Sequence, residues 1–352
     1  MLKNLKLLFL SIFFSILLIE VFLRSVGLYS DLADATLEPS ISIYEKPKDS
    51  IQKRHHPDVF YVNENYFDFD GVKNNTKLTT SKKKNIIGIF GDSFVENYLV
   101  DPKFDFANIL NRNIINYEVV NYGVGGYQAE QAFLRYFKNK DHDLKYVFYF
   151  FMLGDQESYK LLTFKDNNQY TINKVKINPI FQMLGKLNIT YLSIDAFLKL
   201  RILIYNDYSS IKKNNYPEIM ANQIANKNKI GGVFDMNHFA QLIETFQKTV
   251  ESNNAEFFVI LYPNKDHINY FQESIKLRNL KVNYFVLDNS LVTEKKFKFK
   301  NDDHWNEFGN LYFARNIKNF LNTNLKIIFE NDDNYQKIEK EIDSFYSLHK
   351  PR

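Results

Sequence analysis

The chain has 352 residues, of which 45% are hydrophobic and 24% charged, and its formal net charge is +4. This length accommodates one large α/β domain, or one domain with appendages, and the composition is that of an ordinary globular protein. The balance of 45 basic against 41 acidic side chains gives no indication of nucleic-acid binding. The absence of cysteine excludes disulfides, thiolate metal sites and a lipid-modified cysteine anchor.

The first 30 residues bear on localisation. Lys3 and Lys6 precede an apolar stretch from Leu7 to Leu23, which is near the lower length limit for crossing a bilayer, roughly 17–25 residues. Lysines before such a stretch place the amino terminus in the cytoplasm and the remainder outside, in the periplasm. We expect residues 1–28 to be an uncleaved signal anchor, a single transmembrane helix. A cleaved signal peptide and an ordinary buried helix are the alternatives.

Three further regions follow this segment. Residues 29–84 are polar and mixed in composition, which predicts a linker and an irregular segment that packs on the domain. Residues 85–325 have the pattern of an α/β domain, interrupted at about 156–235 by an insertion or lid rich in Asn, Lys and Tyr. Residues 326–352 are charged and helical in pattern, and we expect a C-terminal helical tail on the surface.

Within 85–325, short apolar runs alternate with amphipathic stretches. The runs predict strands at Ile86–Phe90, Glu118–Val120, Tyr146–Leu153, Phe257–Tyr262 and Val282–Leu287. The stretches predict helices at Phe104–Ile115, Gln128–Lys138, Asn237–Asn253, Ile268–Arg278 and Glu307–Leu321. Strands that alternate with helices predict a parallel, doubly wound sheet.

A single serine follows the first of these strands. Residues 88–94 read Gly-Ile-Phe-Gly-Asp-Ser-Phe, so Ser93 stands at the carboxyl end of a buried strand. Ligands of open α/β sheets bind at this edge. A serine hydroxyl there becomes a nucleophile if a base is near, and otherwise it caps the helix that follows. Asp92 is expected to bond loop amides.

A histidine with acidic neighbours lies far downstream, where residues 301–306 read Asn-Asp-Asp-His-Trp-Asn. A histidine base needs a carboxylate that fixes its tautomer and stabilises the imidazolium. His304 therefore stands apart from the other histidines, which have no comparable setting. Because side chains two apart on an extended loop point to one side, Asp302 is preferred over Asp303 as the partner of His304.

Residues 91–94, Gly-Asp-Ser-Phe, resemble the signature block of the SGNH (GDSL-type) hydrolase family. Three more blocks follow in the family's order, and the resemblance covers about 86–322. It implies a flavodoxin-like three-layer α/β/α sandwich with a parallel sheet. It also implies a serine esterase, with Ser93 as nucleophile and His304 as general base. No cofactor is expected, and no metal either, because the sequence has no His-x-x-x-His pair and no dense acidic cluster beyond Asp302-Asp303. The family's usual spacing is Asp-x-x-His, whereas Asp302-x-His304-Trp305 is similar to a variant in related envelope acyl-modifying proteins.

The resemblance also implies an oxyanion site, with the backbone amide of Ser93 as one donor. Residues 121–127, Asn-Tyr-Gly-Val-Gly-Gly-Tyr, are similar to the second block, whose glycine amide aligns with Gly126. A plain glycine-rich turn is the alternative, and nucleotide binding is a weaker one because no full Gly-x-Gly-x-x-Gly is present. The third block departs from the family, because Asp155 replaces an asparagine donor. A protonated Asp155, a contribution from Gln156, a substrate that needs the carboxylate, or an enzyme damaged at this point would each account for it.

These observations together predict a membrane-anchored, extracytoplasmic esterase. It would act on acyl groups, O-acetyl groups in particular, of cell-envelope glycans or lipids through an acyl-Ser93 intermediate. An O-acyltransferase with the same triad is one alternative. A non-catalytic glycan-binding or scaffold protein is another, because of Asp155. We expect the membrane and an acyl-ester substrate as partners, and no nucleic acid.

Overall fold

The computed structural model describes most of the chain from residue 50 onward. The described residues are 2–25, 36–38, 43–45, 50–68, 71–74, 85–152, 161–164, 170–172, 236–300, 302–330 and 334–351. The predicted insertion falls mostly outside them, apart from a small antiparallel pair, β9 (Leu162–Phe164) and β10 (Tyr170–Ile172). A second small pair is formed by β1 (Thr36–Glu38) and β2 (Ile43–Glu45).

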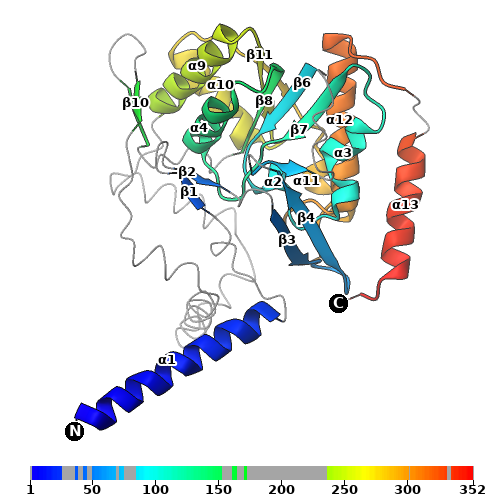
Figure 1. The fold of residues 1–352 in the computed structure, drawn as a ribbon. Helices are drawn as coiled ribbons and strands as arrows, with labels where there is room; N and C mark the ends of the chain where they lie inside the picture. Colours follow the sequence, from blue (N-terminus) through cyan, green and yellow to red (C-terminus); the bar gives the residue numbers. More distant parts are fainter. Residues whose placement is uncertain are drawn as a thin grey trace. The chain divides into compact units, whose positions relative to one another are not determined.

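An eight-stranded sheet forms the centre of the main domain, in the order β12-β11-β8-β6-β7-β5-β4-β3. Its first five strands are parallel, and all five were predicted from the apolar runs. Their bounds are β6 Asn85–Phe90, β7 Tyr117–Asn121, β8 Leu144–Phe151, β11 Glu256–Leu261 and β12 Asn283–Val286. This part of the fold is therefore the predicted doubly wound sheet (Figure 1).

Helices cover both faces of the sheet. The longer ones are α3 (Phe106–Asn111), α4 (Ala129–Asn139), α9 (Met236–Ser252), α10 (Lys265–Leu277), α12 (Glu307–Leu325) and α13 (Asn334–Leu348). The short ones are α2 (Ser93–Glu96), η1 (Pro102–Phe104), α11 (Ser290–Thr293) and η3 (Lys295–Phe297). Figure 1 shows α4, α9 and α10 on one face and α3 and α12 on the other. The fold is thus a three-layer α/β/α sandwich.

The central strand β8 shows how one run of residues supplies both cores. Phe148 and Phe150 pack in the cluster with α3, α12 and α13, whereas Val147, Tyr149 and Phe151 pack in the cluster with α4, α9 and α10. Successive side chains of a strand point to opposite faces, so a strand buried on both faces needs an unbroken apolar run. That run is what made this strand predictable.

One predicted helix is divided in the structure. The pattern over Phe104–Ile115 predicts a continuous helix, but η1 ends at Phe104 and α3 begins at Phe106. Asp105 lies between them in extended conformation, and its Oδ1 accepts the Ala107 N–H at 2.9 Å. An aspartate at this position caps a new helix rather than continuing the old one.

The segment 29–84, predicted to be irregular, contributes three strands to the sheet. These are β3 (Ser50–His55), β4 (Val62–Phe67) and β5 (Lys73–Asn74), all paired antiparallel, with β5 joined to β7. The inward side chains of β4 include Asn63 and Asn65, both fully buried. Because polar residues occupy the buried positions, the apolar alternation that signals a strand is missing.

The N-terminal helix α1 (Leu2–Ser25) belongs to a separate compact unit, made of residues 1–35 and 176–233. It covers the apolar stretch for which a transmembrane helix was expected. None of the helices that the structure describes is long and apolar enough to cross a membrane.

The sheet order places a ligand-binding edge at β6. The chain goes from β6 to β7 on one side and later to β8 on the other, so the direction of winding reverses at β6. In open α/β sheets, ligands bind at such a reversal, outside the carboxyl ends of the strands. Ser93 lies just beyond that end, after Gly91 and Asp92.

Candidate active site

Ser93 is the first residue of α2, and two residues separate it from the end of β6. The preceding Asp92 caps this helix, since its Oδ1 accepts the Phe94 N–H at 3.0 Å, which confirms the expected bond to a loop amide. Gly91 allows the tight turn, because a Cβ there would lie 2.6 Å from Val95 Cγ2. The Ser93 N–H is one of the amides that a helix leaves without an internal acceptor at its first turn.

Three side chains form a continuous hydrogen-bonded chain at this edge. Ser93 Oγ lies 2.7 Å from His304 Nε2, and His304 Nδ1 lies 2.5 Å from Asp302 Oδ1. A carboxylate only accepts, so Nδ1–H donates to Asp302 and the neutral ring presents Nε2 as the acceptor for the serine hydroxyl. The structure thus brings together the three residues predicted to be catalytic, although Ser93 and His304 are 211 positions apart along the chain.

The structure distinguishes the two candidate carboxylates. Asp302 Oδ1 also accepts the His304 backbone N–H at 2.8 Å, so one oxygen holds both the loop and the ring. The Asp303 side chain is 89% exposed, and Lys298 Nζ lies 3.9 Å away. The geometry therefore favours Asp302, as the alternation of side chains along the loop predicted.

The interaction between His304 and Asp302 shifts the pKa of both residues. The hydrogen bond from His304 lowers the pKa of Asp302, although burial opposes the shift. Burial lowers the pKa of His304, but the bond to Asp302 and its charge, with smaller contributions from Asp92 and Asp303, raise it above its ordinary value. The arrangement stabilises the imidazolium, which is the state that His304 enters when it takes a proton from Ser93.

Aromatic packing fixes the orientation of the imidazole. The ring of Phe94 lies against that of His304, with centroids 4.8 Å apart and an interplanar angle of 31°. Trp305 is buried and meets Phe94 edge-on at 5.1 Å. Phe94 and Trp305, which follow Ser93 and His304 in the sequence, therefore pack together. This contact holds the Ser93 and His304 segments next to each other.

The glycine turn after β7 lies beside the serine. A Cβ on Gly125 would be 3.7 Å from Ser93 Cβ, and Gly126 has φ +77°, a backbone conformation that favours glycine. Gly125 N–H donates to Glu96 Oε2 at 2.5 Å. Among the described residues no acceptor pairs with the N–H of Gly126 or of Ser93. Asp155, the third predicted position, lies outside the described residues.

A buried carboxylate supports this turn and was missed by sequence reasoning. Glu96 is fully buried at the end of α2, one turn after Ser93, and its Oε2 accepts the Gly125 N–H. Its charge contributes to the raised pKa of Asp92, which burial chiefly causes and which reaches about 6. The signal was the spacing Ser-x-x-Glu, which is typical of the first turn of a helix and indicates nothing more by itself.

The segment that follows α2 is held by the N-terminal strands. Lys73 Nζ donates to the carbonyls of Glu96 (2.9 Å) and Asn97 (2.8 Å). Asn65 Nδ2 donates to the carbonyl of Tyr98 at 2.9 Å, and Asn63 Nδ2 donates to that of Leu99. Four successive carbonyls thus accept hydrogen bonds from buried side chains of β4 and β5, which we call the carbonyl clamp. These bonds fix the position of the helix that carries Ser93.

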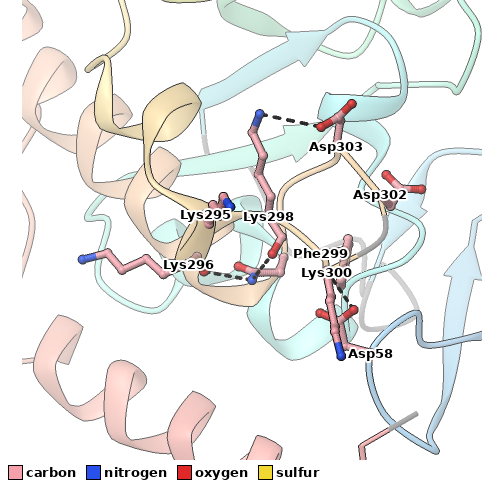
Figure 2. Close-up of a pocket in the computed structure, with 9 residues that line it drawn as sticks. Asp58, Lys295, Lys296, Lys298, Phe299, Lys300, Asp302 and Asp303 are labelled. Carbon is pink, nitrogen blue, oxygen red and sulfur yellow. Dashed lines mark hydrogen bonds and ion pairs between the residues drawn. The ribbon is translucent and has the colours of Figure 1, made fainter. Parts of the chain in front are cut away.

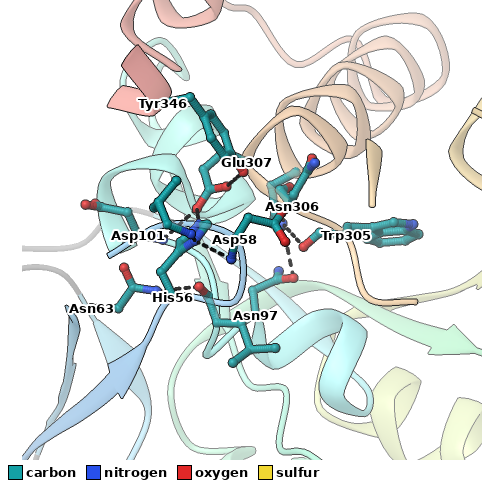
Figure 3. Close-up of polar contacts among 12 residues, drawn as sticks. His56, Asp58, Asn63, Asn97, Asp101, Trp305, Asn306, Glu307 and Tyr346 are labelled. Atoms are coloured by element: carbon teal, nitrogen blue, oxygen red, sulfur yellow. Dashed lines mark hydrogen bonds and ion pairs between the residues drawn. The ribbon is translucent and has the colours of Figure 1, made fainter. Parts of the chain in front are cut away.

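A second buried network supports the histidine loop (Figure 3). Glu307, the first residue of α12, accepts hydrogen bonds from His56 Nε2 (3.1 Å), the Asp101 N–H (3.2 Å) and Tyr346 Oη (2.6 Å). His56 Nδ1 accepts the amides of Asp58 and Val59, so Nε2 carries the proton. His56 was not singled out from the sequence, because a lone histidine carries no signal of its partners.

The described residues contain no cluster of three or more His, Asp or Glu side chains placed to hold a metal ion. The groups gathered at this edge of the sheet are a hydroxyl, an imidazole, a carboxylate and two backbone amides. This set performs nucleophilic acyl transfer on other folds.

No family model matches the sequence, and neither does any curated protein. Among solved structures, the chain is similar to a protein assigned to the G-D-S-L family of lipolytic proteins from Desulfitobacterium hafniense DCB-2, at 14% identity and a TM-score of 0.35. That alignment covers 66% of this chain and 98% of the other. A protein assigned as a GDSL-like lipase from Bacteroides ovatus ATCC 8483 aligns at 11% identity and a TM-score of 0.37, over 71% of this chain and 56% of its own. Likenesses at this level carry no information on activity.

Proposed function

We propose that this protein is an ester hydrolase in which Ser93 is acylated by the substrate. The observation that carries the proposal is the chain of hydrogen bonds from Ser93 Oγ through His304 to Asp302, at 2.7 and 2.5 Å. A serine hydroxyl becomes nucleophilic when a base within hydrogen-bond reach removes its proton, and a carboxylate behind the base supports the charge that results.

The reaction follows from these contacts. Ser93 Oγ attacks the acyl carbonyl as its proton moves to His304 Nε2, and the imidazolium is stabilised by Asp302. The same Nε2–H then protonates the leaving alcohol, so the ester C–O bond breaks and acyl-Ser93 remains. Water, deprotonated by His304, attacks the acyl carbon and releases the carboxylic acid and Ser93. The amides of Ser93 and Gly126 are proposed to bind the oxyanion in both steps.

The substrate class is part of the proposal. The spacing Asp302-x-His304-Trp305 and the lysines before the apolar segment support O-acyl groups, acetyl groups in particular, on cell-envelope glycans or lipids outside the cytoplasm. In this reading the amino terminus lies in the cytoplasm and the domain that carries Ser93 lies outside it.

Asp155 favours a second outcome of the same chemistry. A carboxylate at the third oxyanion position donates no hydrogen bond, and the loss of one donor costs about 10²–10³ in rate. If the carboxylate instead binds a sugar hydroxyl, the acyl group passes to that hydroxyl and the protein is an O-acyltransferase. Product analysis with a sugar acceptor present separates the two, and Asp155→Asn is expected to raise hydrolysis if the carboxylate is a handicap.

Labelling with a fluorophosphonate probe tests the proposal. We expect the full chain to be labelled, and labelling to be lost in Ser93→Ala and strongly slowed in His304→Ala. Ser347→Ala, which removes an exposed serine of α13, is the matched control. If a folded protein shows no labelling that depends on Ser93, the catalytic proposal fails and the non-catalytic glycan-binding or scaffold alternative replaces it.

A further inference from the structure

A groove of about 710 Å³ adjoins the acid side of the site (Figure 2). Its lining comes almost entirely from residues 295–306, the stretch that leads into His304, together with Asp58. Asp302 lines the groove and also bonds the imidazole of His304, so this ring lies between the groove and the hydroxyl of Ser93. A molecule whose ester lies at Ser93 can therefore extend into it.

Lysines dominate this lining. Lys295, Lys296, Lys298 and Lys300 all contribute to the groove. Between them stand Phe297 and Phe299, both buried in the core. The phenylalanines hold the segment against the domain, and the four lysines line the groove. We call these four lysines the lysine row.

Hydrogen bonds tie the lysine row to the histidine loop. The Phe299 N–H donates to the His304 carbonyl at 3.1 Å, and Lys298 and Trp305 form an isolated antiparallel bridge. Asn306 Nδ2 donates to the carbonyls of Lys296 (2.9 Å) and Lys298 (2.8 Å). The row is consequently held in a fixed position relative to the imidazole, as a substrate-binding surface must be.

The acidic residues of the groove leave part of this positive charge unneutralised. Asp302 is engaged by His304, and Asp58 Oδ1 accepts the backbone N–H of Lys300 at 2.9 Å. Lys296 pairs with Glu294 at 3.0 Å, and Lys298 lies 3.9 Å from Asp303. Within the described part of the chain, the exposed ammonium groups of Lys295 and Lys300 have no carboxylate partner. Two cations are thus free to meet a ligand.

The shape of this surface favours a polymer over a membrane. A face that docks on a bilayer needs exposed apolar side chains beside its cations. The one apolar residue in the lining, Phe299, is 3% exposed. The surface is instead concave, with cations spaced along a segment, which suits repeated anionic groups on an extended chain.

We propose that the lysine row binds a phosphate- or carboxylate-bearing segment of the ester substrate, so that the enzyme selects anionic envelope polymers. The proposal rests on the function proposed above, because it concerns the substrate of that site. Its test does not require turnover, so failure of the groove and failure of the catalysis are distinguishable.

The test is binding of short polyphosphate and of polygalacturonate to the full chain, measured by titration calorimetry at low and high salt, with neutral dextran for comparison. The two polyanions separate phosphate from carboxylate recognition. We expect salt-sensitive binding of at least one of them and none of dextran. Lys295→Gln/Lys300→Gln removes the two unpaired cations and is expected to weaken this binding by about fivefold, since each exposed pair contributes about 0.2–1 kcal/mol.

The control is Lys337→Gln/Lys340→Gln, which removes the same charge from exposed positions of α13 and is expected to leave the dissociation constant unchanged. Equal binding by wild type and the Lys295/Lys300 variant, at matched melting temperatures, overturns the proposal. So does an equal loss in the control, which indicates attraction to net charge alone. Binding of anionic phospholipid vesicles that depends on Lys295 and Lys300, without polyanion binding, overturns it in favour of membrane docking.

Discussion

The imidazole of His304 lies between the neutral hydroxyl of Ser93 and the charged carboxylate of Asp302, and the carboxylate determines the pKa of the ring. Its pKa is raised because the hydrogen bond and charge of Asp302 outweigh the effect of burial. The base must be neutral to accept the Ser93 proton. Activity therefore falls as pH drops through this pKa, and we expect the acid limb of kcat/KM above about 6.5, the ordinary value for histidine.

Asp302→Asn tests this cause. The amide keeps the shape of the side chain but removes the charge, so the pKa of His304 falls and the acid limb moves to lower pH. The maximal rate falls by roughly 10³–10⁴-fold, because the tautomer is no longer fixed. Asp303→Asn is the comparison, and it should move the limb less, in the same direction. An unchanged limb in Asp302→Asn would contradict the assignment.

Asp92 makes the stability of the fold depend on pH. Burial raises the pKa of this carboxyl to about 6, whereas the unfolded chain has a value of about 3.9. Between these values the folded state keeps a proton that the unfolded state releases, so the stabilisation is present below about pH 4 and is lost as pH rises through about 6.

Asp92→Asn removes this dependence and keeps a cap, because the asparagine oxygen can still accept the Phe94 N–H. Relative to wild type, the variant should gain on the order of 1–3 kcal/mol in free energy of unfolding between about pH 4 and pH 7. Urea unfolding of both proteins at about pH 4 and about pH 7 measures this change in the free energy of unfolding. A difference between the two proteins that does not vary with pH would show that Asp92 does not titrate in this range.

At the scale of elements, the sequence reveals those parts whose buried positions are apolar. The parallel strands β6, β8 and β11 were predicted because each is an apolar run, and the loops of Ser93 and His304 were placed because parallel strands end at one edge. The strands β3 to β5 could not be predicted, since Asn63, Asn65 and Lys73 occupy their buried positions. Those polar residues donate hydrogen bonds to carbonyls more than 20 residues away in the sequence, and the local sequence pattern does not identify such distant partners.

Lys73→Met tests the carbonyl clamp. The substitution removes two bonds to the carbonyls after α2 and leaves Asp105, which Lys73 pairs at 3.1 Å, as a buried charge. We expect a loss of about 3–5 kcal/mol in free energy of unfolding, as for other broken buried pairs. Asp105→Asn in the same chain should restore part of it, because the asparagine oxygen still caps α3.

The control for this prediction is Lys145→Met, at an exposed position of β8, where a change within about 0.5 kcal/mol is expected. Denaturant unfolding measures stability, and fluorophosphonate labelling reports whether Ser93 remains placed. A Lys73 variant as stable as wild type would mean that water replaces the clamp, and the N-terminal strands would then not support the nucleophile.

The C-terminal helix α13 is part of the hydrophobic core of the sheet domain. The sequence predicts a helical tail docked on the surface, and α13 buries Tyr335, Ile338, Ile342 and Phe345 in the same cluster as β6 and α12, while Tyr346 reaches Glu307 beside the histidine loop. The apolar spacing was visible, whereas its destination was not, because an amphipathic face does not identify what it packs against.

Ile342→Ala tests whether this helix is part of the core. The side chain is fully buried, so its truncation should cost about 2–5 kcal/mol in free energy of unfolding, through lost burial and the cavity that remains. Lys340→Ala, on the exposed face of the same helix, should change it by no more than about 0.5 kcal/mol. Because Tyr346 is one turn further along and bonds Glu307, the Ile342 variant should also slow labelling of Ser93. A destabilised variant that is labelled at the wild-type rate would show that α13 supports the fold but not the histidine loop.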